Sequence, residues 1–107
     1  IDKPRVVKDR YGLVVSDEAY HELFRKRRYI LVFISTSFPN YVLEDYEYLV
    51  EEGTEEFESS GLPKPSIIKA HRIILLQEDA ILEEVGILPM SLVNKIRNVS
   101  LKRMFGL

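Results

Sequence analysis

Six consecutive residues, Tyr29–Ile34, carry apolar side chains with no polar interruption. A strand with one face in water alternates apolar and polar residues, so this continuous run predicts a strand that is covered on both faces. The run is far shorter than the roughly 20 residues that span a bilayer, so we expect no membrane partner. Ser35-Thr36-Ser37 and then Pro39 follow it, and proline removes a donor from a strand ladder. The segment is therefore predicted to be the central strand of a sheet.

Further strands are predicted on both sides of this run. Residues 13–15 form a short apolar run that ends at Ser16. Residues 66–76 predict one long strand, or two strands joined by a bend near His71. The alternation across 46–50 predicts another strand. Its expected faces are Tyr46, Tyr48 and Val50 on one side and Glu47, Leu49 and Glu51 on the other.

Helices are predicted where a capping residue lies next to apolar residues that are spaced at helical intervals. Asp17 is placed to cap a short helix through residue 24, with His21 on its solvated side. Residues 78–86 predict a second short helix that ends at a glycine, and 90–105 predict an amphipathic helix. Residues 53–65, rich in glycine, proline and serine, predict a surface loop. The order of elements predicts a mainly β fold, in which a small, strongly bent barrel-like sheet carries helices, including one at the C-terminus.

Composition limits the chemistry that the chain can perform. The 107 residues include no cysteine and two histidines, so disulfides, iron–sulfur clusters and thiolate nucleophiles are excluded. We expect no metal and no cofactor, and a reducing cytoplasmic location suits such a chain. We find no internal repeat and no stretch that could link two domains, so residues 1–107 are expected to form a single domain.

Charge is unevenly distributed along the chain although the formal net charge is only -2. Every charged residue from Phe38 to Ser60 is acidic, whereas the segments on either side are net basic. A nucleic acid would have to bind the basic segments, with the acidic stretch turned away from it. Alternatively, the acidic stretch contacts a basic partner or the basic segments themselves.

Several motifs resemble those of one toxin family, the MazF/PemK (Kid) toxins. The segment 10–16, Arg-Tyr-Gly-Leu-Val-Val-Ser, is similar to the family's arginine-initiated strand. Residues 61–73 resemble its Gly-Leu, Ser-Val-Val and Ala-Asp-Gln-Ile stretch. Residues 85–89 and 105–107 resemble its Leu-Gly-x-Leu and Leu-Gly-Leu sequences. The family normally has a strand before the arginine, so either this chain lacks that first strand or Val6 and Val7 supply it.

The resemblance implies an SH3-like barrel that forms a homodimer, cleaves single-stranded RNA without a metal, and is inhibited by a cognate antitoxin. In such cleavage the 2′-hydroxyl attacks the neighbouring phosphate, which requires a base, a cation and an acid. The exposed apolar residues expected near the C-terminus, Met104, Phe105 and Leu107, also favour a homodimer. The implied function is that of an mRNA interferase, the toxin of a toxin–antitoxin system.

The resemblance also indicates which residues form the site. Arg10 stands at the position of the catalytic arginine, and Ser35 or Thr36, with Thr36 preferred, at that of a threonine which positions the phosphate. Lys69 and His71 stand where members have arginine and an acidic residue, and a histidine can also exchange a proton near neutral pH. Separated by two along a strand, they are expected to face the same side. Phosphate contacts are expected from Arg25, Arg27, Arg28 and Arg72.

Each assignment has a purely structural alternative. Arg10 would form a surface ion pair, His71 would be a hydrogen-bonded structural residue, and the basic turn at 25–28 would simply be solvated. Two functional alternatives also stay open: an inactive binding module with the same fold, or a toxin that acts on a protein target, as the related CcdB proteins do. Cleavage of RNA without added metal separates these alternatives from the nuclease.

Overall fold

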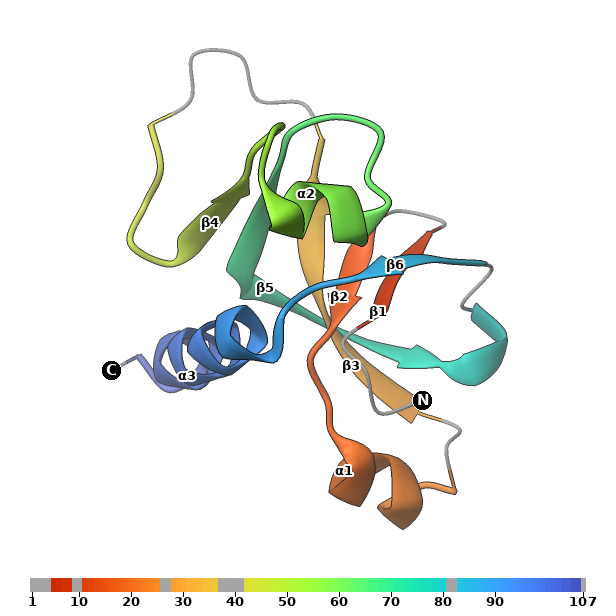
Figure 1. Cartoon of the computed structure of the whole chain (residues 1–107). Helices are drawn as coiled ribbons and strands as arrows, with labels where there is room; N and C mark the ends of the chain where they lie inside the picture. The colour runs from red at the N-terminus through yellow and green to blue at the C-terminus, as the bar shows by residue number, and fades with distance from the viewer. Residues whose placement is uncertain (1–4, 9–10, 26–27, 37–41, 81–82, 107) are drawn as a thin grey trace.

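The computed structural model describes residues 5–8, 11–25, 28–36, 42–80 and 83–106. Within these ranges the chain forms one curled antiparallel sheet with three α-helices around it (Figure 1). The strand order is β4-β5-β3-β2-β1-β6. The strands are β1 Arg5–Lys8, β2 Gly12–Val14, β3 Arg28–Ser35, β4 Glu47–Val50, β5 Ser66–Gln77 and β6 Glu83–Ile87. The α-helices are α1 Glu18–Leu23, α2 Glu55–Ser60 and α3 Met90–Met104, and a 3-10 helix occupies Glu78–Ala80. The predicted fold class, mainly β with a C-terminal helix, is confirmed.

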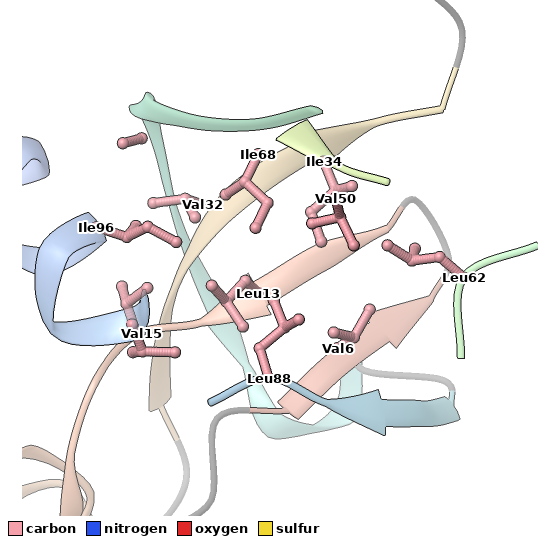
Figure 2. Close-up of a cluster of buried hydrophobic side chains, with 12 residues drawn as sticks. Val6, Leu13, Val15, Val32, Ile34, Val50, Leu62, Ile68, Leu88 and Ile96 are labelled. Carbon is pink, nitrogen blue, oxygen red and sulfur yellow. The ribbon is translucent and has the colours of Figure 1, made fainter. Parts of the chain in front are cut away.

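The apolar run forms β3, as predicted, and this strand lies inside the sheet between β2 and β5. Its side chains contribute to both faces, because Val32 and Ile34 belong to one buried cluster and Tyr29 and Leu31 to another. The larger cluster gathers side chains from β1, β2, β3, β5 and α3 (Figure 2). Each side chain of this kind that is removed from water stabilises the fold by about 1.5–3 kcal/mol.

The helices cover the sheet unequally. Val93 and Ile96 of α3 are buried in the larger cluster, and Phe57 of α2 packs against it. On the other face, α1 lies by the N-terminal half of β3, where the rings of His21 and Tyr29 are 4.7 Å apart. None of the helices among the described residues is long and apolar enough to cross a membrane.

The position of His21 differs from the sequence prediction. Asp17 caps α1 as expected, but His21 is 1% exposed rather than solvated. The Oγ atom of Ser16 lies 2.7 Å from Nε2 of His21 and accepts a hydrogen bond from the backbone N–H of Ile30. The helix is therefore docked on β3 through its histidine. A polar side chain can be buried at this position because the hydroxyl satisfies one of its ring nitrogens.

Two predicted elements are wrong. Residues 53–65 are not all loop, since α2 begins after the Thr54 cap and ends at Gly61, which has the left-handed φ of 71°. Thr54, three glutamates in the first turn and a terminal glycine are each typical of a helix. Residues 83–87 form β6 instead of a helix, because pairing with β1 overrides the local helical pattern. Val6 and Val7 do form a strand, β1.

Two glycines allow α2 to pack on β6. The two edges of the sheet are β4 and β6, and α2 follows β4 along the chain yet contacts β6. The hydroxyl of Ser59 donates to the carbonyl of Ile87 at 3.0 Å. A Cβ atom on Gly86 would lie 2.3 Å from the Ser59 carbonyl oxygen, and one on Gly61 would lie 1.8 Å from that of Val85. The close approach of α2 to β6 therefore requires that both positions lack side chains.

We expect Gly86→Ala to lower the free energy of unfolding by about 2 kcal/mol or more, because the added methyl group meets backbone atoms that have little room to move. Gly53→Ala is the matched control, since nothing lies within 4 Å of its Cβ position and only its positive φ opposes the change. It should cost about 1 kcal/mol. Urea denaturation measures both values. If both substitutions lowered the free energy of unfolding equally, the close packing of α2 on β6 would not explain the loss at Gly86.

Candidate functional site

A bulge in β5 breaks its pairing with β3 where the sequence predicts a bend. Val32 pairs with Ile73, but the next residue of β3, Phe33, pairs with Lys69. Residues 70–72 are consequently left out of the β3–β5 ladder. A bulge bends its strand and redirects side chains, and bulges are common beside active sites. Three predicted site residues, Lys69, His71 and Arg72, lie in or directly beside this bulge.

Both backbone groups of Ala70 in this bulge are hydrogen-bonded elsewhere. Its N–H donates to the carbonyl of Tyr46 at 3.1 Å, and its carbonyl accepts from the Ser100 hydroxyl of α3 at 2.6 Å. Ala70 is fully buried, so these polar groups could not remain unpaired without a cost of about 1–3 kcal/mol each. The bulge is thus held in place by the turn before β4 and by the C-terminal helix.

Lys69 is fixed by a carboxylate that the sequence analysis did not select. Its Nζ lies 2.9 Å from Oε2 of Glu47, and the two residues are paired directly across β4 and β5. The other oxygen of Glu47 accepts from the backbone N–H of Glu44 at 2.9 Å. The side chain of Glu47 is 1% exposed and that of Lys69 is 14% exposed. The direction of the Lys69 ammonium group is therefore set by a buried ion pair.

His71 is exposed and stacks edge-on against Tyr46, with ring centroids 4.5 Å apart. Partial burial of its ring lowers its pKa; the Glu47 carboxylate raises it, and the charges of Lys69 and Arg72 lower it. The net pKa lies below the ordinary value of 6.5, so the ring is neutral at neutral pH.

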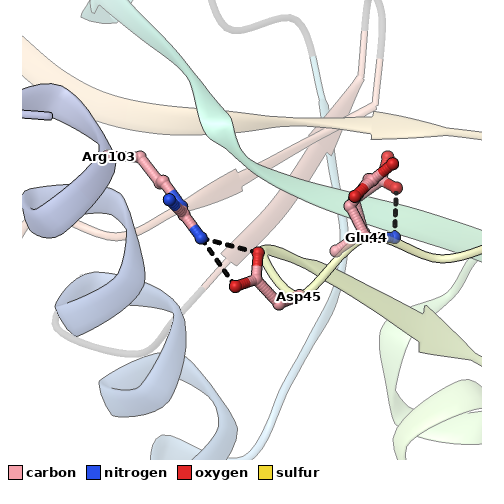
Figure 3. A network of polar contacts seen from close by, with 4 residues as sticks. Glu44, Asp45 and Arg103 are labelled. Atoms are coloured by element: carbon pink, nitrogen blue, oxygen red, sulfur yellow. Dashed lines mark hydrogen bonds and ion pairs between the residues drawn. The ribbon is translucent and has the colours of Figure 1, made fainter. Parts of the chain in front are cut away.

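The C-terminal helix reaches this histidine through one arginine. Nη2 of Arg103 lies 2.7 and 2.6 Å from the two carboxylate oxygens of Asp45 (Figure 3). The guanidinium carbon of Arg103 also lies 5.2 Å from the ring centroid of Tyr46, which in turn contacts His71. Glu47 and Asp45 thus confirm one of the two expectations for the acidic stretch, namely contact with basic residues of the same chain. Glu47 of this stretch thus contacts Lys69, one of the predicted site residues.

The predicted hydroxyl groups lie at the end of β3, close to the bulge. Ser35 is the last residue of β3, two residues after the partner of Lys69, so Ser35 and Lys69 share a face of the sheet. Thr36 follows at a bend and is half-buried. The backbone N–H of Ile34 donates to the carbonyl of Tyr11 at 3.0 Å, so β2 begins beside this end of β3. The structure therefore gathers Ser35, Thr36 and the β5 bulge in one region.

The basic turn is not part of this region. Arg28 begins β3 and Arg25 lies in the turn before it, with a left-handed φ of 54°. An eight-residue strand is about 23 Å long, so it separates both arginines from Thr36 by nearly that distance. Arg28 lies over the ring of Phe24, with 4.8 Å between guanidinium carbon and ring centroid. Arg10 and Arg27 lie outside the described residues.

A cavity of about 230 Å³ lies between α1 and α3. Among its lining residues are Val15, Ile30 and Met104, and it contains none of the predicted site residues that the structure describes. Across the described part of the chain, no three histidine, aspartate or glutamate side chains are arranged to hold a metal ion. The β5 bulge and the adjacent end of β3 are the candidate site, because they carry Lys69, His71, Arg72, Ser35 and Thr36.

Comparison with known proteins identifies the family of the chain. The family model of the PemK-like, MazF-like toxins of type II toxin–antitoxin systems matches residues 3–105. The chain belongs to this toxin family. No curated protein matches the chain in sequence.

Solved structures show the same fold as this MazF-like toxin. The Mycobacterium tuberculosis toxin MazF-mt6 is 15% identical, with a TM-score of 0.68 over 98% of this chain and 97% of that one. An endoribonuclease from a mycobacterial species, solved in complex with its cognate antitoxin, is 16% identical, with a TM-score of 0.66 over 96% and 91%. The predicted resemblance and barrel-like fold are thus confirmed.

We expect Glu47→Ala to destabilise the protein by about 3 kcal/mol, because it leaves the Lys69 ammonium group largely buried without its carboxylate. Asp45→Ala is the control. It removes the partner of Arg103 from an exposed ion pair and should cost less than about 1 kcal/mol. Thermal or urea unfolding of the two variants measures the difference. A small loss for Glu47→Ala would mean that the pair does not hold Lys69.

Proposed function

We propose that this chain is the toxin of a type II toxin–antitoxin system and acts in the cytoplasm as a metal-independent endoribonuclease on single-stranded RNA. The observation that supports the proposal is the β5 bulge, because Lys69, His71 and Arg72 lie in or beside it and Lys69 shares a face of the sheet with Ser35. Two similar structures are endoribonucleases from mycobacterial species, which supports this class of reaction.

In the proposed reaction, the 2′-oxygen of a ribose attacks the neighbouring phosphorus, and the bond from phosphorus to the 5′-oxygen breaks. His71 is the proposed base that takes the 2′-hydroxyl proton, because its lowered pKa keeps the ring neutral at neutral pH. The products are a 2′,3′-cyclic phosphate and a 5′-hydroxyl end.

Cations stabilise the negative charge that develops on the phosphate oxygens. The family resemblance assigns this role to Arg10, whose planar guanidinium group can bind two oxygens at once. Lys69 supplies a second positive charge, oriented by Glu47, and is the proposed acid that protonates the departing 5′-oxygen. The Thr36 hydroxyl is proposed to position the phosphate.

Two protein partners belong to the proposal. A mycobacterial endoribonuclease of this fold binds its cognate antitoxin, and we infer that an antitoxin also inhibits this chain. A second copy of the chain is the other partner, because Leu101 and Met104 of α3 are 54% and 55% exposed. Light scattering at micromolar concentration should give the mass of a homodimer, and a monomer would contradict this inference.

The proposal is tested by incubating the protein with single-stranded RNA in the presence of a metal chelator. We expect cleavage by the wild type and a loss of about 100-fold or more in kcat for Arg10→Ala, since removing one group that stabilises the transition state has an effect of this size. Lys95→Ala removes an exposed positive charge from α3 and should leave cleavage unchanged. A folded homodimer without cleavage would contradict the proposal and favour a binding module or a toxin directed at a protein.

The pH dependence of cleavage tests the role of His71. If its neutral ring is the base, kcat/KM should rise with pH and level off above a midpoint below 6.5. Below that midpoint the ring is protonated and cannot accept the 2′-hydroxyl proton. His71→Gln should remove this acidic limb and lower the plateau about 100-fold or more. A variant that keeps the limb would show that another group is the base.

A further inference from the structure

Phe33 lies in the candidate site, although no sequence pattern marks it as a functional residue. It pairs with Lys69 on the β5 side and with Gly12 on the β2 side. Side chains of directly paired residues lie on the same face of a sheet, so the Phe33 ring projects beside the Lys69 side chain. Ser35, two residues along β3, projects on this face as well.

The ring is only half-buried, unlike its neighbours on this face of β3. Tyr29 and Leu31 are 4% and 1% exposed, in the half of the strand near α1. On the β2 side Phe33 faces a glycine, so no side chain of its direct partner there covers it. Among the described residues of this face, the sheet is therefore more open at Phe33 than at Leu31. Phe33 is also the residue that pairs with the predicted site residue Lys69.

Arg72 lies over this ring. Its guanidinium carbon is 5.0 Å from the ring centroid of Phe33, and Arg72 itself is an exposed residue of the β5 bulge. Single-stranded nucleic acids bind through aromatic rings and arginine planes on which bases stack, beside positive charges that contact the backbone. Phe33 and Arg72 supply the first of these features, and Lys69 lies directly beside them.

We propose that Phe33 and Arg72 form a stacking subsite for one nucleobase of single-stranded RNA next to the scissile phosphate. This inference rests on the proposed function, because it names how the same site holds its substrate. The base lies against the planar guanidinium group of Arg72, which the Phe33 ring supports from below. Lysine at position 72 would keep the charge but would lack the plane.

The competing explanation is structural: an aromatic ring that covers a glycine on the neighbouring strand stabilises a sheet by itself. Under that explanation Phe33 affects stability but not the recognition of a base. The test must therefore compare RNA ligands as well as variants of the protein.

The experiment measures binding of a short 2′-O-methyl RNA, which lacks the attacking hydroxyl and cannot be cleaved, by fluorescence anisotropy. Phe33→Leu and Arg72→Lys should each weaken binding by about 5-fold to 100-fold, the range found when stacking on one base is lost. Phe24→Leu is the matched control, because Arg28 lies over Phe24 in a similar pair near the opposite end of β3. That variant should bind the short RNA as tightly as the wild type.

A scan with abasic nucleotides then identifies the stacked base. At one position, removal of the base should weaken binding to the wild type as much as Phe33→Leu does, and should have no further effect on that variant. Unchanged affinity of Phe33→Leu, or equal losses at every abasic position, would overturn the stacking subsite while leaving the nuclease proposal standing. Failure of the wild type to bind any single-stranded RNA would overturn both.

Discussion

The bulge in β5 is the feature on which the site depends. In a regular strand, successive side chains point to opposite faces of the sheet. A regular β5 would therefore place Lys69 and His71 on one face and Arg72 on the other. The bulge persists because both backbone groups of the buried Ala70 are satisfied, one by Tyr46 in the turn before β4 and the other by Ser100 of α3. The C-terminal helix therefore shapes the site although its own residues are far away in sequence. Its Arg103 adds a second link through Asp45 and Tyr46 to His71.

Electrostatics at the site come from a stretch that, taken alone, would repel RNA. The acidic segment places Glu47 against Lys69 and Asp45 against Arg103, so part of its charge is neutralised within the chain. Glu47 is almost entirely buried and also accepts a backbone hydrogen bond, which makes it a fixed element of the structure. Its negative charge opposes the effects of burial, Lys69 and Arg72 on the pKa of His71. Burial and the positive groups favour the neutral ring, Glu47 opposes them, and the net pKa of His71 stays below its ordinary value.

Local patterns in the sequence predicted the elements whose identity depends on short-range physics. The apolar run correctly predicted β3, and the capping residue Asp17 correctly predicted the start of α1. Helical spacing of apolar residues correctly predicted α3. The missed features depend on contacts between segments far apart in the chain. Residues 83–87 have a helical pattern but pair with β1, and Glu47 meets Lys69 only once β4 and β5 are in register. Thr54 and Gly61 are typical helix-capping residues and could have predicted α2. The nearby prolines and serines favoured a loop instead. Family motifs, rather than periodicity, led to Lys69 and His71.

In the proposed reaction, a neutral histidine and oriented cations promote attack by a 2′-hydroxyl on the neighbouring phosphate of RNA. The chemical nature of the new ends distinguishes this reaction from hydrolysis by an activated water, which does not use the 2′-oxygen. The most direct measurement is therefore mass spectrometry of the fragments formed from single-stranded RNA in the presence of a chelator. We expect fragments that end in a 2′,3′-cyclic phosphate, each matched by a fragment with a 5′-hydroxyl. Fragments with 5′-phosphate ends, or cleavage of the fully 2′-O-methylated RNA, would contradict the account.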